Sequence, residues 1–283
     1  DRSPSRGLGD VYKRQGPIIS SEGGQVVGLL KRNRALIEND YTIVRSVDDA
    51  INAVREHVTY GADIIKICAN NTPNNTSLTI DEMKAIVKMA KRYNRKVTAH
   101  ATNDLAIWEA VTAGVNAIEH GYQVSDTTLV LMAKKGVALV PTDLSKNLLN
   151  KYMDFLEFEG DREKATDGYQ KNLKDRLQRA IKANVTILTG SDNYINFEMP
   201  QGEAAKNILL AYHEEGMKPI DILRSSTYLS AEFMGKSNRL GVLKKGAYAD
   251  IIAVKGDVED DFSNAIIDLV FVMKNGKVYV DKK

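Results

Sequence analysis

Two histidines, a lysine and an aspartate stand at or near the ends of short apolar runs. His100 closes the run KVTAH, and His120 closes NAIEH. Lys66 lies near the end of DIIKIC, and Asp192 ends TILTGSD. In α/β proteins built on a ring of parallel strands, the active site lies at the carboxyl ends of the strands. Two neutral imidazoles and a carboxylate there suit Zn²⁺ or a similar ion, with a position left open for water.

A parallel sheet is needed to bring these residues together, and the flanking sequence predicts one. The expected strands are Gly16–Ser21, Asp63–Cys68, Lys96–His100, Val115–His120, Val137–Thr142 and Val185–Asp192. The expected helices are Asp48–Val58, Ile80–Lys91, Asp104–Ala113, Thr127–Lys135 and Lys164–Ala183. Thr79 and Glu82 form a capping box at the start of one helix. Strands that alternate with helices in this way are typical of βαβ units.

The end of the chain follows another pattern. Its expected elements are helices over Gly202–Glu215 and Pro219–Met234, then strands over Ala249–Val254, Leu269–Lys274 and Lys277–Val280. Asn275-Gly276, between the last two strands, is a strong hairpin signal. We therefore expect a small antiparallel sheet after the parallel α/β body.

The composition excludes several classes of protein. The chain has 283 residues, is 43% hydrophobic and 27% charged, and carries a formal charge of +2. No basic stripe of the kind that binds nucleic acid is present, and no apolar run is long enough to cross a membrane. The one cysteine, Cys68, excludes an intrachain disulfide and fits a reduced compartment. This favours the cytoplasm, but the sequence begins with Asp1 rather than Met, so localisation stays open.

The motifs around the four polar residues resemble the amidohydrolase superfamily, in its imidazolonepropionase- and prolidase-like branch. The matching stretches are GADIIKI, VTAHA, AGVNAIEHG, LVPT, TGSD, RLGVLKKGAYADIIAV and VMKNGKVY. Their order and spacing together carry the resemblance, which runs from about residue 16 to the end. It implies strands three to eight of a TIM-type (β/α)₈ barrel over residues 16–235 and part of a small β-sandwich over 236–283. Residues 1–15 lack apolar periodicity and are expected to be a non-native or disordered tail.

The resemblance also implies a metal site. Lys66 would carry a carbamate derived from CO₂ and bridge two Zn²⁺ ions, and His100 and His120 would hold the second of them. Asp192 would bind the first ion and act as general base on a metal-bridging hydroxide. Tyr122, just after His120, is a candidate substrate contact.

One part of the family pattern is missing. Family members open with a strand that bears His-x-His, and this motif occurs nowhere in the sequence. The resemblance therefore implies an N-terminally truncated chain, and we expect the chain as given to have little or no activity.

Each residue also has a simpler interpretation. Lys66 alone would be a surface lysine whose stem packs on apolar neighbours, and Asp192 would cap the following segment. Cys68 is expected to be a packed thiol rather than a nucleophile. His57 and His213 lie in helical patterns and are expected to be exposed to solvent. The long segment from Leu144 to Tyr169 is the candidate for a lid over substrate.

The favoured function is metal-dependent hydrolysis of a C–N bond in an amide or peptide, such as a dipeptide, an N-acyl amino acid or a cyclic amide. One alternative is a mononuclear deaminase or an imidazolonepropionase, which needs no carbamate on Lys66. The other is an inactive fragment or degenerate homologue with a binding role. The expected partner is a small amide or peptide, with no nucleic acid or membrane, and homo-oligomer formation stays open.

Overall fold

The structure is a computed structural model that describes residues 16–25, 40–72, 75–193 and 195–282. The tail expected over residues 1–15 lies outside these ranges. The chain divides into two compact units. The first comprises Asp1–Val140 with Ala183–Thr186, and the second comprises Pro141–Lys182 with Ile187–Lys283. The boundary expected at residue 235 stays a prediction.

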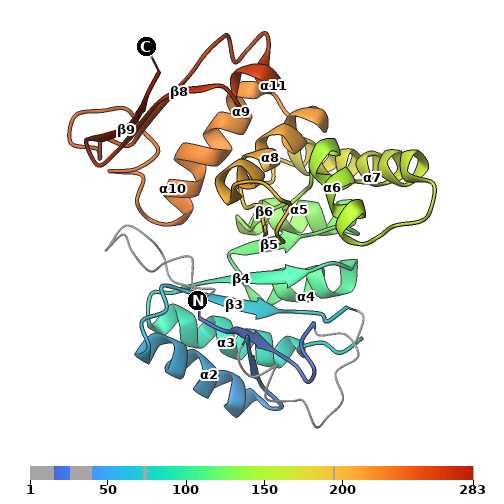
Figure 1. The fold of residues 1–283 in the computed structure, drawn as a ribbon. Helices are drawn as coiled ribbons and strands as arrows, with labels where there is room; N and C mark the ends of the chain where they lie inside the picture. Colours follow the sequence, from blue (N-terminus) through green and yellow to red (C-terminus); the bar gives the residue numbers. More distant parts are fainter. Residues whose placement is uncertain (1–15, 26–39, 73–74, 194, 283) are drawn as a thin grey trace. The chain divides into compact units, whose positions relative to one another are not determined.

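The first unit is built on a six-stranded parallel sheet, in the strand order β2-β1-β3-β4-β5-β6 (Figure 1). Its strands are β1 (Ile18–Ser20), β2 (Tyr41–Ile43), β3 (Ile64–Cys68), β4 (Lys96–Ala101), β5 (Ala117–His120) and β6 (Ala138–Val140). The predicted α/β class with a parallel sheet is confirmed.

In the part of the chain that the structure describes, four helices connect these strands. They are α2 (Val47–Thr59), α3 (Ile80–Arg92), α4 (Asp104–Ala113) and α5 (Asp126–Lys135), and each contacts the next. All four begin at a Ser, Thr or Asn whose side chain accepts a hydrogen bond from a backbone N–H of the first turn. The predicted capping box of α3 is present. Helices α4 and α5 end at Gly114 and Gly136, both in the left-handed conformation that glycine adopts without strain.

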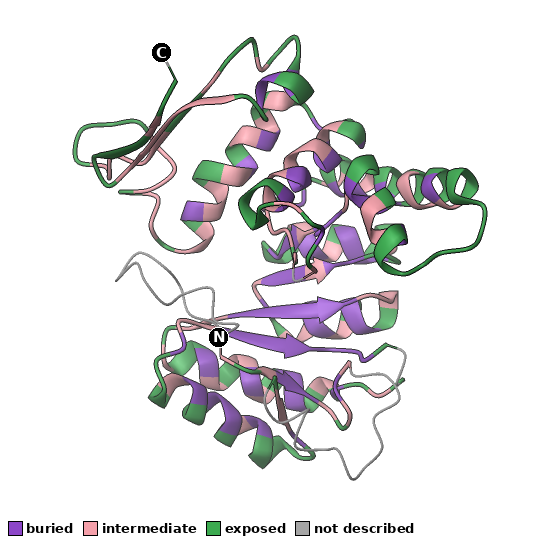
Figure 2. Cartoon of the chain, in the orientation of Figure 1, coloured by how far each residue is buried: buried purple, intermediate pink, exposed green. Residues whose placement is uncertain are grey.

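Strand alternation divides the sheet into two faces. Ile65 and Ile67 of β3 have no exposed surface, and neither has Ala99 of β4. These alternate with Lys66 and with the other polar positions of the same strands. Figure 2 shows β3 and β4 buried along their length, whereas the helices beside them expose one face. The polar positions therefore share one face of the sheet.

The second unit is mostly helical. Its helices are α6 (Lys146–Phe155), α7 (Arg162–Lys182), α8 (Gln201–Glu214), α9 (Pro219–Arg224), a π-helical turn (Ser225–Leu229), α10 (Ser230–Phe233) and α11 (Phe262–Ala265). Tyr212 is fully buried, and its hydroxyl donates to the carbonyl of Leu188 at 2.8 Å. No described helix of the chain is both long enough and apolar enough to cross a membrane.

A three-stranded antiparallel sheet follows the helices of this unit. Its strands are β7 (Ile251–Val254), β8 (Leu269–Lys274) and β9 (Lys277–Asp281), in the order β7-β8-β9. The turn residues Asn275 and Gly276 both have positive φ, as the predicted hairpin requires. The carboxylate of Asp250 accepts a bond from the backbone N–H of Asn275 at 2.7 Å and pairs with Lys274. The expected satellite sheet is confirmed.

Several local expectations were wrong. Val185–Asp192 forms no strand in the structure, although the N–H of Leu139 donates to the carbonyl of Thr186 at 2.9 Å. The positive φ of Asp192 is incompatible with an extended strand end. Strand β2 and helix α6 were not predicted. His57 is buried rather than exposed, because it lies on the inner face of α2. Its Nε2 atom forms a hydrogen bond with the hydroxyl of Thr42, over 3.0 Å.

Two buried carboxyl groups lie near one buried guanidinium in the core of the second unit. Arg176 of α7 pairs with Asp143, and neither side chain has any exposed surface. Glu215, just after α8, is also buried and lies against Asp143. Burial, and then the neighbouring charge of Asp143, raise the pKa of Glu215 to about 10. Burial therefore favours the protonated form of the Glu215 carboxyl group, in a cluster that joins α7 and the end of α8 to the segment that carries Asp143.

Substitution of Arg176 by alanine should lower the free energy of unfolding by about 3–5 kcal/mol, because it leaves a buried carboxylate without its cation. The matched control is Arg179→Ala on the same helix. Arg179 pairs with the largely exposed Asp175, so its loss should cost less than about 1 kcal/mol. Urea unfolding followed by circular dichroism measures both values. Equal losses in the two variants would contradict the assignment.

The raised pKa of Glu215 also predicts a pH dependence of stability. Above its ordinary value of 4.5 the carboxyl group ionises in the unfolded chain but stays protonated in the folded one. Unfolding then releases a proton, so stability should fall as pH rises from about 5.5 to 8.5, on the order of a few kcal/mol. Arg176, Asp143, Tyr212 and Glu214 surround the group and set the size of the effect.

Glu215→Gln removes this titration with little change of shape. Urea unfolding at both pH values, compared between wild type and variant, isolates the effect of Glu215 from that of other groups. The variant should gain stability relative to wild type at the higher pH. A difference that does not change with pH would show that Glu215 is ionised in the folded protein.

Candidate active site

The register of three neighbouring strands places the predicted residues on one face. Lys66 of β3 lies beside Thr98 of β4, and Cys68 lies beside His100. His100 in turn lies beside Glu119 of β5. Residues directly opposite one another in a sheet point to the same face, so the ammonium, the imidazole and the carboxylate share it. All three lie near the carboxyl ends of their strands.

The side chain of His120 also lies beside His100, but an unusual backbone conformation places it there. It pairs with Ala101, a position from which an extended residue would face away from His100. However, its φ is +69°, outside the extended region. Its ring contacts that of His100 edge to face, with centroids 4.5 Å apart. Non-glycine residues in this backbone conformation cluster at functional sites, where the surrounding structure supports their strain.

Lys66 is buried, with 7% of its surface exposed, and forms an ion pair with Glu119. A lysine ammonium inside an apolar strand is costly unless it is paired or chemically changed. The simpler interpretation of Lys66 as a surface lysine is therefore wrong. The pairing with Glu119 was not anticipated, although Glu119 lies in the same apolar run as His120.

The environment of His100 keeps its imidazole neutral. Burial, and then the positive charge of Lys66, lower the pKa of His100 to about 3. The side-chain amide nitrogen of Gln25 lies 2.9 Å from Nε2 and 3.2 Å from Nδ1 of His100. The same amide accepts from the hydroxyl of Tyr41, at 3.3 Å between oxygens. A neutral ring with an available lone pair is the form of histidine that binds a metal ion.

Two buried asparagines join the loops that follow β1, β3 and β4. Asn71 accepts from the hydroxyl of Ser20 at 3.0 Å and donates to that of Ser21 at 3.0 Å. Asn70 accepts from the backbone N–H of Thr102 at 2.9 Å and donates to its hydroxyl at 2.8 Å. The loop that carries Gln25 is thereby fixed to the end of β3. Sequence reasoning missed Gln25 and both asparagines, because polar loop residues have no periodic signal.

Two further predicted residues lie beside these groups. Tyr122 is 40% exposed, and its ring centroid lies 5.5 Å from that of His120. This position is compatible with a substrate contact, which stays a prediction. Cys68 is fully buried, and burial raises its pKa to about 12. Its thiol donates to the carbonyl of Asn70 at 3.2 Å, as expected of a packed thiol and not of a nucleophile.

The remaining predicted ligand, Asp192, belongs to the second unit. Its side chain is exposed, and its φ is +46°. The structure thus brings Lys66, His100 and His120 together within the first unit. The role of Asp192 stays a prediction. Within the second unit, the predicted lid segment contains helix α6 and the start of α7.

The side chains at this site supply two of the ligands that a metal ion needs. His100 and His120 are adjacent, buried and on one face, which is what two imidazole ligands require. In the described ranges, no group of three or more His, Cys, Asp or Glu side chains is placed to hold a metal. A third ligand from these strands would have to come from Lys66, whose ammonium is a ligand only after conversion to an anion.

Comparison with known proteins agrees with the motifs. The profile of the Amidohydrolase family matches residues 19–279. Ochratoxinase from Aspergillus niger is 28% identical over 258 residues, which cover 84% of this chain and 50% of that protein. The chain thus spans about half the length of the curated relatives it matches.

Solved structures show the same likeness. A prolidase complexed with N-methylphosphonate-L-proline has a TM-score of 0.79 at 28% identity, covering 94% of this chain and 68% of that one. A Xaa-Pro dipeptidase with methionine bound in its active site has a TM-score of 0.78 at 25% identity, covering 95% and 68%. The six-stranded sheet is accordingly part of a TIM-like barrel. The chain belongs to the amidohydrolase family.

Proposed function

We propose that this chain belongs to a metal-dependent hydrolase that cleaves a C–N bond in a small amide or peptide. The observation that carries the proposal is the contact between His100 and His120, at the strand ends beside Lys66. Two imidazoles at this spacing would hold one metal ion. When bound, such an ion polarises a carbonyl group and lowers the pKa of a water molecule toward neutrality.

The other residues would act on substrate and protons. Asp192 is proposed as the general base that accepts the proton of the attacking water and passes it to the leaving nitrogen. Tyr122 is exposed beside His120, where a substrate group can reach it. Gln25, whose side-chain amide nitrogen lies within 3.2 Å of both ring nitrogens of His100, would orient this ring or contact a substrate group.

The substrate class is proposed from the relatives. Prolidase and Xaa-Pro dipeptidase are among the matched structures, and ochratoxinase is a matched relative. Dipeptides with a C-terminal proline, N-acyl amino acids, cyclic amides and ochratoxin A therefore form the test panel.

A mononuclear site is the second candidate, and the ion pair of Lys66 with Glu119 favours it. An ammonium paired with a carboxylate repels a dication and bridges nothing. With a carbamate, Lys66 becomes an anionic ligand and two metals are expected; without it, one is expected. Deaminases and imidazolonepropionase are the classes that the mononuclear site would suit.

His100→Ala and His120→Ala should each lower metal content and abolish hydrolysis of the panel, because each removes an imidazole ligand. The protein tested is the product of the longest open reading frame that contains this sequence. Plasma mass spectrometry after dialysis gives metal per chain, and release of free amine gives the rate. His213→Gln, in helix α8, is the control and should change neither. Unchanged metal content in the His100→Ala/His120→Ala double variant would overturn the proposed site.

The state of Lys66 separates the two candidate sites. A carbamate should give a ¹³C resonance after incubation with ¹³C-bicarbonate, together with two metals per chain, and Lys66→Ala should abolish both. Glu119→Gln removes the competing carboxylate and should increase carbamate occupancy. One metal per chain and no ¹³C signal, with activity retained in Lys66→Ala, would establish the mononuclear site instead.

A further inference from the structure

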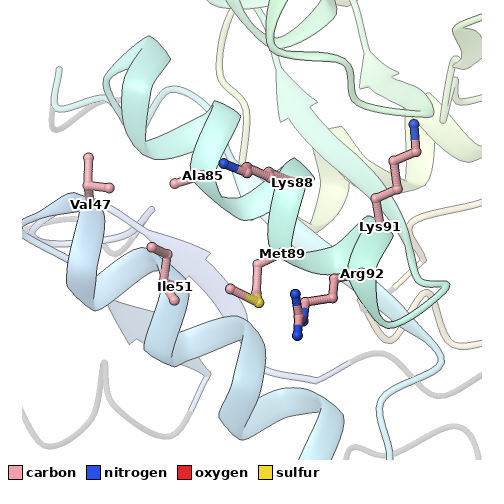
Figure 3. Close-up of a pocket in the computed structure, with 7 residues that line it drawn as sticks. All are labelled: Val47, Ile51, Ala85, Lys88, Met89, Lys91 and Arg92. Carbon is pink, nitrogen blue, oxygen red and sulfur yellow. The ribbon is translucent and has the colours of Figure 1, made fainter.

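A groove lies between the outer surfaces of α2 and α3 in the first unit (Figure 3). Val47 and Ile51 lie one helical turn apart on α2, while Ala85, Lys88, Met89 and Arg92 form one stripe on α3. Lys91 completes the lining. The cavity has a volume of about 540 Å³, within the range of small-molecule sites.

The floor of this groove is apolar and accessible. Val47 is 40% exposed, and Ile51, Ala85 and Met89 are partly exposed. In Figure 3 the side chains of Ile51 and Met89 point into the space between the two helices. A partly open apolar surface of this kind gains free energy when an aliphatic group covers it.

Three cations, Lys88, Lys91 and Arg92, gather in the last two turns of α3. Among the described residues none of them forms an ion pair, whereas Lys84, one turn earlier, lies 3.5 Å from Asp81. The C-terminal end of a helix favours cations in its last turn, which accounts for Lys91 and Arg92 without any ligand. It does not account for Lys88, nor for the apolar groove beside all three.

The cations and the apolar side chain of Val47 lie toward different ends of the groove. In Figure 3, Val47 lies at one end, and Lys91 and Arg92 lie at the other. A ligand with an anionic group at one end and an aliphatic chain behind it matches both parts of this lining.

We propose that this groove binds a free aliphatic carboxylate of medium chain length. Its head group contacts Lys88 and Arg92, and its chain lies over Met89, Ile51 and Val47. All of the lining residues belong to α2 and α3, so this site is separate from the histidine site and does not depend on the proposed hydrolase activity.

Decanoate, titrated into the full chain below its micelle concentration, tests the proposal by isothermal titration calorimetry. One saturable site is expected. The double variant Lys88→Glu/Arg92→Glu should bind decanoate at least about tenfold more weakly, because it loses charge-assisted hydrogen bonds to the carboxylate. Met89→Gln keeps the length of the side chain but removes apolar contact, and should also weaken binding. Lys84→Glu, on the same helix outside the groove, should bind as wild type does.

Two further probes distinguish the head from the tail. 1-Decanol has the same chain without the charge, and acetate has the charge without the chain, so both should bind at least about tenfold more weakly. Absence of saturable decanoate binding would overturn the proposal, as would equal binding by 1-decanol or by a Lys88→Glu/Arg92→Glu variant with wild-type circular dichroism. Binding of an acidic peptide in place of decanoate would assign the groove to a protein partner instead.

Discussion

The ladder of β3, β4 and β5 determines which side chains can meet in this protein. Parallel pairing sets Lys66, His100 and Glu119 on one face within three adjacent strands. A slip of one residue in either pairing would turn a strand's polar residues toward the helices. The apolar positions resist such a slip, because Ile65 and Ile67 are fully buried on the opposite face. The position of the site is thus a consequence of core packing.

Burial of Lys66 is the second constraint, and it follows from the first. The register that buries Ile65 and Ile67 forces Lys66 into a site with 7% exposure. A charged group there requires a partner, and Glu119 supplies one across β4. Conversion of the amine to a carbamate would remove the cation and leave the carboxylate of Glu119 beside a second anion. A bound cation would then have to offset both, so carbamate formation and metal binding would stabilise each other.

The sequence predicted those elements whose bounds are determined by hydrophobic periodicity, by helix-capping residues or by turn residues. The four capped helices of the first unit, α2 to α5, were placed almost to the residue, and so was the hairpin at Asn275-Gly276. Strand β2 is only three residues long and none of them is fully buried, so it has no alternation to detect. Helix α6 did carry a signal, since Ser145 caps it and Leu148, Leu149 and Met153 are buried, but the segment was interpreted as a loop. Polar contacts between distant loops, such as that of Gln25 with His100, depend on the tertiary fold and have no local signal.

For the candidate ligands, the sequence predicted which residues lie together but not the state of their ionisable groups. Two histidines at strand ends were predicted as ligands because of the sequence motifs around them. Only the fold shows that burial, and then the charge of Lys66, lower the pKa of His100, and that the side-chain amide of Gln25 lies beside its ring. A neutral ring needs no deprotonation before it binds a cation. A metal ion at His100 would therefore compete with the amide of Gln25 rather than with a proton, and Asn71 joins the loop that carries Gln25 to the end of β3 through Ser21.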